Sequence, residues 1–394
     1  MSLKLDRRTF LGASAALAGT SIAPFRAFAD VPKTMQWTAA DVGSSGYIEA
    51  TAIANALIEK FGTRIRIVPS GTSIGRMMQL KQGRVNMGFL ANECFFATEA
   101  MYDFSTREWG PQDLRALMGR EALFGIVTAK DAGIKTIADL KGRRVARIQA
   151  HPSTNFKIEG ELAFAGLTWD DVDAIEVPGY SAGIQAVIDG NVDAAGAVVG
   201  ASLLRELEAS PRGIYWPPVP ADDAEGWDRM NAVAPLFAPS TMTNGPGASP
   251  ENPVPMVAYR YPILSVYADR SADEVYELTK AIASAYDLYK KSAPVMAGYD
   301  VNQAGHPPFD APVHEGARRY YEEIGIWTDK DEAWNAKRLA RLEKVQEAWT
   351  AATEEADEKN VPDAKWPAFW EDYRKANLGR PSDRAAVHAL ARPP

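Results

Sequence analysis

The sequence contains very little cysteine. Its single thiol, Cys94, stands at the end of an apolar segment in a chain of 394 residues. One cysteine can form no disulfide within the chain and cannot assemble a thiolate metal site. Because a thiol at the end of an apolar strand is typically buried, we expect Cys94 to be structural and not a nucleophile.

Histidine is also scarce, and its spacing matches no metal motif. The four histidines are scattered without an H-E-x-x-H or similar pattern, so we expect no metal and no cofactor. The sequence also lacks a nucleophile elbow and the lysine of a phosphate-binding loop. These absences favour a protein that is not an enzyme.

Long apolar runs are missing beyond the first 29 residues. Residues 6–11 (DRRTFL) resemble a twin-arginine export signal, followed by a short apolar run at 11–23 and a cleavage site at 27–29 (AFA). This run is too short and too rich in alanine, glycine and serine to persist as a membrane span. We expect residues 1–29 to be a signal peptide and the mature protein to be periplasmic; the alternative is a cytoplasmic amphipathic N-terminus.

An excess of basic charge is absent as well. Removing residues 1–29 leaves 39 basic and 50 acidic side chains. A nucleic-acid partner requires a basic face, so we expect none. A small anionic ligand is compatible with this balance, because the local field of a cleft can oppose the net charge.

The most informative segment covers residues 68–92 (VPSGTSIGRMMQLKQGRVNMGFLAN). It predicts the end of a strand, a loop of small residues, a helix that stops at Gly83, and another strand. Residues 177–199 (VPGYSAGIQAVIDGNVDAAGAVV) repeat this order. The repetition predicts two similar lobes, although strand–loop–helix units resemble one another in any α/β protein.

Loops with hydroxyl groups precede several predicted helices. We expect two from each predicted lobe to converge on a ligand: 43–47 and 70–73 from one lobe, and 153–155 and 180–183 from the other. The first turn of a helix has unpaired N–H groups and a partial positive charge, so it can bind a carboxylate without a lysine. The alternative for each hydroxyl is an ordinary helix cap.

Further candidates lie at the ends of predicted strands or in the predicted crossover. Asn92 follows a strand and is either a ligand contact or a helix cap, whereas Arg120 either clamps a carboxylate or pairs with a neighbouring acid. Aromatic rings are suited to covering the carbon skeleton of a ligand. The predicted ligand-binding residues are Gly43, Ser44, Ser45, Tyr47, Ser70, Gly71, Thr72, Ser73, Asn92, Arg120, Phe124, Arg147, Ser153, Thr154, Asn155, Tyr180, Ser181 and Gly183.

The remaining pattern divides the chain into parts. An apolar segment at 114–127 predicts a crossover between lobes, and 256–267 predicts a strand that returns through the hinge. Helices are expected at 271–291, 314–324 and 331–376, with the tryptophans of the last segment docked onto the body. We therefore assign 30–120 to the first lobe, 121–255 to the second, 256–327 to the return, and 328–394 to a helical C-terminal extension and a loose tail.

Taken in order, several segments resemble the solute-binding receptors of the TAXI class of TRAP transporters. They are ADVGSSGYIEATAIANAL, IVPSGTSIGRMMQLKQGRVNMGF, GIKTIADLKGRRVA, GLTWDDV with GYSAGIQAVIDGNVDAA, and DEVYELTKA with VHEGARRYYEEIG, over about residues 36–326. The resemblance implies an α/β, bilobal class-II periplasmic binding protein fold, with the ligand between lobes that close around it. It also implies an integral membrane TRAP transporter as partner.

The chain departs from the family pattern at two of the proposed ligand loops. The first loop usually carries a longer glycine run, where this chain has residues 41–46 (DVGSSG). The second-lobe loop usually reads like a Gly-Ser-Gly-Thr run, where this chain has residues 151–155 (HPSTN). The ligands associated with the family, glutamate and 2-oxoglutarate, are therefore not carried over. We expect a receptor for a small organic anion, with a carboxylate favoured; the rival interpretations are a periplasmic enzyme and a ligand sensor for a membrane signalling protein.

Overall fold

The structure, a computed structural model, describes residues 31–379. The predicted signal peptide at 1–29 and the predicted tail at 381–394 lie outside the described residues. Within the described part of the chain, none of the helices is long and apolar enough to cross a membrane.

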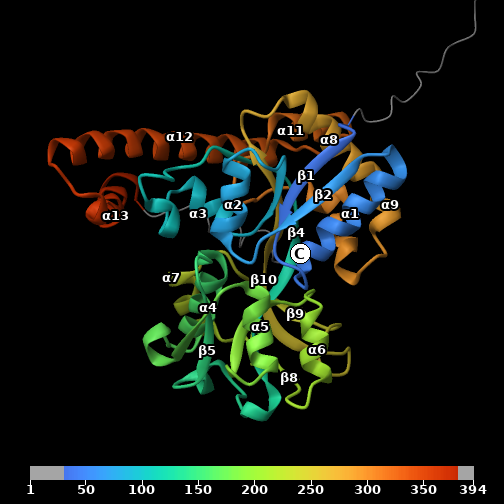
Figure 1. The fold of residues 1–394 in the computed structure, drawn as a ribbon, viewed down its shortest axis with the longest axis vertical. Helices are drawn as coiled ribbons and strands as arrows, with labels where there is room; N and C mark the ends of the chain where they lie inside the picture. The colour runs from blue at the N-terminus through green and yellow to red at the C-terminus, as the bar shows by residue number, and fades with distance from the viewer. Residues whose placement is uncertain (1–30, 380–394) are drawn as a thin grey trace, which may run out of the picture.

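A single mixed sheet runs through both lobes, and the chain changes lobe along two long strands. β4 (Leu114–Ala129) and β10 (Val254–Tyr267) pair antiparallel over most of their length. The sheet continues through β3, β1 and β2 in the upper lobe of Figure 1 and through β7, β5 and β6 in the lower lobe. Because β4 and β10 lie where the sequence predicted a crossover and a return strand, the predicted fold of two α/β lobes joined by hinge strands is confirmed.

In the first lobe, strands β2, β1 and β3 are parallel to one another. Helix α1 is capped at its N-terminus by Ser44, whose hydroxyl accepts a hydrogen bond from the Tyr47 amide, and at its C-terminus by Gly62, which adopts a left-handed φ of 72°. Ile53 and Leu57 lie on the buried face of α1, as their spacing predicts. The elements of this lobe are β1 (Thr34–Ala39), α1 (Ser45–Phe61), β2 (Arg64–Pro69), α2 (Ser73–Lys81), β3 (Met87–Leu90), α3 (Glu93–Thr98), η1 (Tyr102–Ser105), α8 (Ala272–Ser284), α9 (Tyr286–Tyr289), η5 (Pro294–Tyr299), α10 (Val301–Ala304) and α11 (Glu315–Glu323).

The second lobe is built in the same way around the parallel strands β6, β5 and β7. Helix α4 begins with Pro152, and the His151 ring accepts a hydrogen bond from the Thr154 amide as a cap. The elements of this lobe are η2 (Lys130–Ala132), η3 (Ile137–Leu140), β5 (Arg144–Ile148), α4 (Pro152–Phe164), η4 (Trp169–Asp171), β6 (Asp173–Val177), α5 (Tyr180–Ile188), β7 (Ala194–Val198), α6 (Leu203–Ala209), β8 (Ile214–Tyr215), α7 (Ala224–Val233) and β9 (Ala238–Met242).

The repeated sequence segments occupy matching places in the two lobes. The first forms β2, α2 and β3, with β1 between the two strands; the second forms β6, α5 and β7, with β5 between them. In each lobe, therefore, the helix that follows the repeated loop points its N-terminus toward the carboxyl end of a parallel sheet. The prediction of two similar lobes is confirmed.

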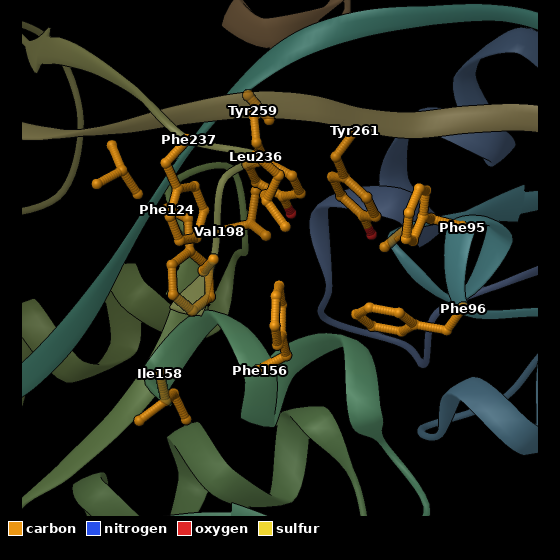
Figure 2. Packing of buried hydrophobic residues seen from close by; sticks show 14 of the residues in the cluster. Phe95, Phe96, Phe124, Phe156, Ile158, Val198, Leu236, Phe237, Tyr259 and Tyr261 are labelled. Carbon is orange, nitrogen blue, oxygen red and sulfur yellow. The ribbon is translucent and has the colours of Figure 1, made fainter. Parts of the chain in front are cut away.

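The hydrophobic core is continuous across the boundary between the lobes. Figure 2 shows Tyr259 and Tyr261 on β10 beside Phe156 from α4 and Phe96 from α3. These residues belong to one buried cluster that draws on both lobes. The predicted buried thiol of Cys94 is confirmed in this cluster, and burial raises its pKa far above the usual value.

The C-terminal extension consists of α12 (Asp329–Glu358) and α13 (Trp366–Leu378), connected by η6 (Asp363–Lys365). In Figure 1 the long helix α12 lies along one edge of the first lobe, with α13 beneath its far end. Trp366 and Trp370 are fully buried against Ala100, which confirms that these tryptophans dock onto the body. Glu99, buried beside them, forms ion pairs with arginines of α12.

Glu161 on α4 is a buried carboxyl with an incomplete set of hydrogen bonds. One oxygen accepts from the Ile126 amide at 2.8 Å, and the other has no partner. Burial raises the pKa of Glu161 to about 8, against the smaller lowering effect of the Ile126 amide. The folded state therefore holds a proton that an unfolded chain releases near pH 4.3.

From this difference we predict a loss of stability as the pH rises from about 4.5 to about 8, because folding then requires Glu161 to take up a proton. Glu161→Gln removes this contribution, which is on the order of 3 kcal/mol between pH 4.5 and 7. Thermal unfolding at pH 5 and pH 8 measures it: the variant gains stability over the wild type at pH 8 relative to pH 5. The exposed Glu206→Gln in the same lobe is the control, and a difference that does not change with pH contradicts the assignment.

Candidate functional site

Hydrogen bonds between loops hold the two lobes against each other. The Tyr180 amide donates to the Gly71 carbonyl at 3.0 Å, and the Ser202 amide donates to the Gly43 carbonyl at 2.9 Å. Gly71 and Tyr180 belong to the two repeated segments, so the repeats meet at the lobe boundary. The structure is thus a closed form, in which all four predicted loops lie along the interface between the lobes.

A carboxylate of the first lobe binds the N-terminus of helix α5 in the second lobe. Asp41 accepts hydrogen bonds from the Ser181 amide at 3.0 Å and from the Ser181 hydroxyl at 2.8 Å. A Cβ atom at Gly71 would lie 2.9 Å from Asp41 Oδ2 and 3.2 Å from Gly179 Cα, so this approach requires glycine. The predicted anion position at residues 180–183 is therefore occupied by a carboxylate of the chain itself.

Deeper between the lobes lies a small cavity of about 20 Å³. This volume is room for roughly one water molecule. Its wall combines two cations, a histidine, a threonine and three tyrosines with three apolar residues. The lining residues are Ala40, Arg76, Ala91, His151, Thr154, Lys157, Tyr180, Val198, Tyr259 and Tyr261.

Lys157 is the most unusual group in this wall. Its ammonium is fully buried and donates to the Asn92 side-chain oxygen at 3.1 Å, to the Ser153 carbonyl at 2.8 Å and to the Ser153 hydroxyl at 2.9 Å. All three acceptors are neutral, and the ring of Tyr259 lies 4.8 Å from the charge. Burial lowers the pKa of Lys157 to about 7.

Other charged groups near Lys157 act on its pKa in opposite directions. Glu93 and Asp310 raise the pKa and Arg76 lowers it, but all three effects are smaller than that of burial. The lysine is therefore close to the midpoint of its titration at neutral pH. An anion bound beside it would favour the charged form.

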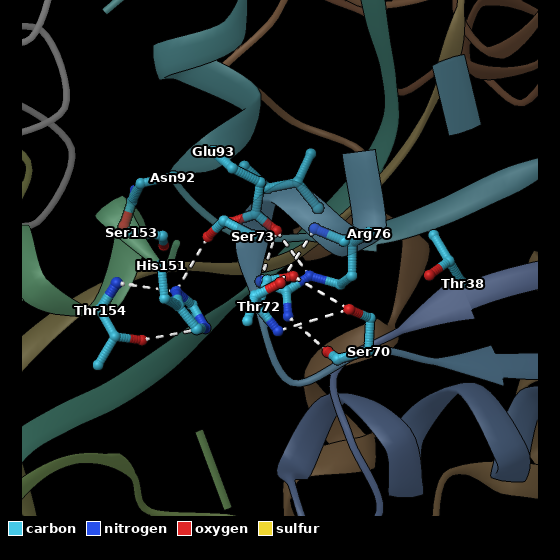
Figure 3. Close-up of polar contacts among 12 residues, drawn as sticks. Thr38, Ser70, Thr72, Ser73, Arg76, Asn92, Glu93, His151, Ser153 and Thr154 are labelled. Carbon is cyan, nitrogen blue, oxygen red and sulfur yellow. Dashed lines mark hydrogen bonds and ion pairs between the residues drawn. The ribbon is translucent and has the colours of Figure 1, made fainter. Parts of the chain in front are cut away.

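The second cation, Arg76, is already paired. Its guanidinium lies 2.7 Å from Glu93 Oε1 and also donates to the Ser70 carbonyl at 3.2 Å. Figure 3 shows this pair beside Ser73, with Ser70 below it. Because both members of the ion pair are buried, Arg76 and Glu93 largely neutralise each other.

His151 connects the two lobes as a neutral ring. Its Nδ1 atom lies 2.9 Å from the Ser73 hydroxyl and accepts from the Thr154 amide at 3.3 Å (Figure 3). Burial lowers the pKa of His151 well below its usual value, and the neighbouring charges of Arg76 and Lys157 lower it further. The imidazole therefore stays neutral across the physiological pH range.

Three tyrosine hydroxyls lie around the same cavity. The Tyr259 hydroxyl is buried and has no hydrogen-bond partner, although an unpaired buried hydroxyl is costly. The Tyr180 oxygen accepts from the Val198 amide at 2.8 Å, so its own proton remains available for donation. Tyr261 packs its hydroxyl so closely against Gly46 that a Cβ atom there would overlap with it.

Of the residues predicted from the sequence, Thr154 and Tyr180 line the cavity, and three others contact its wall. Ser153 and Asn92 bind the Lys157 ammonium, and Ser73 binds His151. The side chain of Asn92 makes no helix cap; it also donates to Asp310 at 2.9 Å. Gly71 and Ser181 lie at the closed mouth, in the contact with Asp41.

Arg120 does not reach the cavity, contrary to one of the two interpretations of its role. It forms a buried ion pair with Glu49, to which it donates from Nε at 2.8 Å, and the Tyr299 hydroxyl binds the same carboxylate at 2.8 Å. Ser45 hydrogen-bonds Glu49 as well. Both predicted residues are thus part of a buried polar cluster in the first lobe.

Several other predicted residues lie outside the cavity wall. The buried Phe124 ring stacks on Phe237 and lies 5.4 Å from the Lys157 ammonium, whereas Arg147 is exposed over the ring of Trp169 and Asn155 binds the backbone of Ile148. Ser44 and Thr72 cap helices, which is the alternative that the sequence left open. The other predicted residues outside the cavity wall are Gly43, Tyr47, Ser70 and Gly183.

Sequence reasoning missed Lys157, Arg76, Tyr259 and Tyr261, although each has a local signal. Lys157 is the only charged residue between His151 and Ile158, and it follows Ser153 by one helical turn. Tyr259 and Tyr261 alternate on the hinge strand and so share one face of the sheet. The side chains that lie opposite Tyr259 and Tyr261 depend on how the two lobes are joined.

Among residues 31–379 no three or more histidine, cysteine, aspartate or glutamate side chains are arranged to hold a metal ion. Of the charged groups at the cavity, Arg76 pairs with Glu93, and Lys157 binds neutral acceptors. The absence of a cofactor remains a prediction.

The chain belongs to the NMT1-like family, whose pattern it matches over residues 38–325. The match covers both lobes and the two hinge strands and ends at the C-terminal extension. The structure consists of two α/β lobes, and the chain crosses between them on β4 and β10.

Among solved structures, the chain is similar to the alkanesulfonate-binding protein SsuA from Xanthomonas axonopodis pv. citri bound to MOPS, at 14% identity and a TM-score of 0.42 over 75% of this chain and 91% of that one. It is also similar to the periplasmic aliphatic sulphonate binding protein SsuA from Escherichia coli, at 18% identity and a TM-score of 0.39 over 78% and 92%. A third similar structure is the Gly52Ala mutant of arginine-bound ArgBP from T. maritima, at 11% identity and a TM-score of 0.37 over 64% of this chain and 95% of that one.

The contact between Asp41 and Ser181 leads to a prediction about closure. Asp41→Asn removes the negative charge at the N-terminus of α5 and puts an amide in place of one acceptor oxygen. We expect the variant to populate an open form more than the wild type, with a larger radius of gyration by small-angle X-ray scattering. Val42→Ser, at the exposed neighbouring side chain, is the control and should scatter like the wild type; equal scattering of Asp41→Asn and wild type contradicts the prediction.

Proposed function

We propose that the protein is an extracytoplasmic solute receptor that captures a small organic anion between its two lobes. The observation that carries this proposal is the buried Lys157 ammonium at the interlobe cavity, which has only neutral hydrogen-bond acceptors around it. A carboxylate placed there gains a cation that is already desolvated. The unpaired Tyr259 hydroxyl provides a further donor.

Capture follows from the architecture of the hinge. β4 and β10 are the long strands on which the chain passes between the lobes, so bending them separates the walls of the cavity. The cavity wall, which includes Lys157 on α4 of one lobe and Ala40 of the other, is complete only when the lobes are shut. Binding energy then favours closure.

The place of action and the partner come from the sequence. The twin-arginine-type segment at residues 6–11 supports export to the periplasm. The ordered motifs that resemble TAXI receptors support delivery of the ligand to an integral membrane TRAP transporter. The closed, two-lobed form is the shape that such a membrane partner would receive.

A thermal-shift screen of organic acids on the mature protein tests the receptor role. An acid that binds raises Tm by about 3–4 °C at a hundredfold excess over Kd. Lys157→Gln should abolish the shift, whereas Lys141→Gln, at an exposed lysine of the same lobe, should preserve it. If no acid in a broad panel stabilises the wild type at millimolar concentration, the proposal fails.

The pKa of Lys157 also predicts how binding depends on pH. In the free protein Lys157 loses its proton above about pH 7, so binding of an anion at higher pH requires Lys157 to take up a proton. The affinity should therefore fall about tenfold per pH unit between pH 7.5 and 9. His151 does not contribute to this slope, because its pKa is lowered below the range. Calorimetric titrations from pH 6 to 9 measure the effect.

Lys157→Arg is the matched variant for this experiment, because a guanidinium keeps its charge throughout the range. Its affinity for the same acid should be nearly independent of pH, even where the altered geometry weakens binding overall. A wild-type affinity that is constant from pH 6 to 9 would show that Lys157 is not the counter-ion.

A further inference from the structure

We infer that the interlobe cavity takes a compact organic monoanion, whose charged group lies between Lys157 and the tyrosine hydroxyls, and that it rejects amino acids and dicarboxylates. This inference rests on the receptor role proposed above and adds the chemical class of the ligand. Four features of the cavity carry it: the absence of an acidic lining residue, a single available cation, unused hydroxyl donors, and the small volume.

The cavity wall contains no carboxylate side chain. Its polar members are Arg76, Lys157, His151, Thr154 and the three tyrosines. The nearby carboxylate of Glu93 is held by Arg76 at 2.7 Å and receives the Ser73 hydroxyl at 3.4 Å. The ammonium group of an amino acid would therefore be buried without an anionic partner, which is costly.

Only one of the two cations is available to a ligand. The guanidinium of Arg76 is already paired with Glu93 and bound to the Ser70 carbonyl, whereas Lys157 contacts neutral acceptors alone. A first carboxylate can therefore pair with Lys157. A second carboxylate on the same ligand would find no free counter-ion in the wall.

The hydroxyl groups around the cavity have unused donor capacity. Tyr259 has no partner for its hydroxyl, and Tyr180 uses its oxygen only as an acceptor for the Val198 amide. Together with Lys157, these donors surround a space that an oxyanion, with several lone pairs, would satisfy. A neutral ligand would leave the ammonium without a counter-ion.

The size of the cavity favours a short molecule. The closed form leaves about 20 Å³, and the apolar part of the wall is limited to Ala40, Ala91 and Val198. A ligand with a short carbon skeleton requires the least separation of the lobes and so retains most of the contacts at the closed mouth. A longer ligand would separate the lobes further and so break the hydrogen bond between Asp41 and the Ser181 amide.

Isothermal titration at pH 6.5 with a defined panel tests the inference. The monoanions are acetate, propionate and pyruvate; the competitors are succinate, 2-oxoglutarate, glutamate and arginine. We expect at least one monoanion to bind about tenfold or more tightly than every competitor, since each competitor buries at least one uncompensated charge. Tighter binding of a dicarboxylate or an amino acid overturns the inference.

Tyr259→Phe separates recognition from folding. Because the Tyr259 hydroxyl has no partner in the closed structure, its removal should leave the unliganded protein as stable as the wild type or more so. Affinity for the best monoanion should fall about tenfold, the usual effect of losing a hydrogen bond to a charged group. Tyr267→Phe is the control, because Tyr267 lies on the same strand as Tyr259 and its hydroxyl donates to Gln112.

The outcomes distinguish this inference from the receptor proposal. If a dicarboxylate or an amino acid binds best and Lys157→Gln abolishes that binding, the class assignment is wrong while the receptor role stands. If Tyr259→Phe binds the monoanion as tightly as the wild type, the tyrosine hydroxyls are not ligand donors and the inference fails. If no compound in the panel or in the broader acid screen binds, both proposals fail.

Discussion

The burial of one ammonium group between two lobes is the constraint on which the proposed site depends. Lys157 leaves water at a high free-energy cost, and the chain compensates with three neutral acceptors and an aromatic ring. Those groups orient the ammonium without neutralising it. An anion bound beside Lys157, as proposed above, would offset part of this cost and would thereby gain affinity.

Closure uses a second electrostatic contact with a different role. Asp41 places a carboxylate at the N-terminus of α5, where the helix dipole and the Ser181 amide favour negative charge. The same contact keeps this helix terminus from serving as the ligand site. In the proposed function the anion is instead recognised by side chains at the floor of the cavity. The two glycines Gly71 and Gly179 allow the lobes to approach closely at the Asp41 contact.

Local patterns explain which predictions held. Patterns that depend on neighbours within a few residues predicted strands, helices and two lobes. These patterns are the alternation of residues 64–68, the spacing of Ile53 and Leu57, and the repeated strand–loop–helix segments. The ligand site depends on contacts between distant segments. Arg120 illustrates the difference, because its partner Glu49 lies 71 residues earlier and no spacing rule connects them.

The sequence alone predicted two α/β lobes, the hinge strands and the helical extension, because hydrophobic periodicity and turn residues act locally. The position of the loops between the lobes was implied only by the resemblance to the receptor family. Tertiary structure decided which loop groups face a ligand. Pairing β4 with β10 brought Tyr259 beside Lys157, and closure placed Asp41 on α5. Those choices follow from how the two lobes are joined through one continuous sheet, and burial then fixed which charges are paired and which remain available.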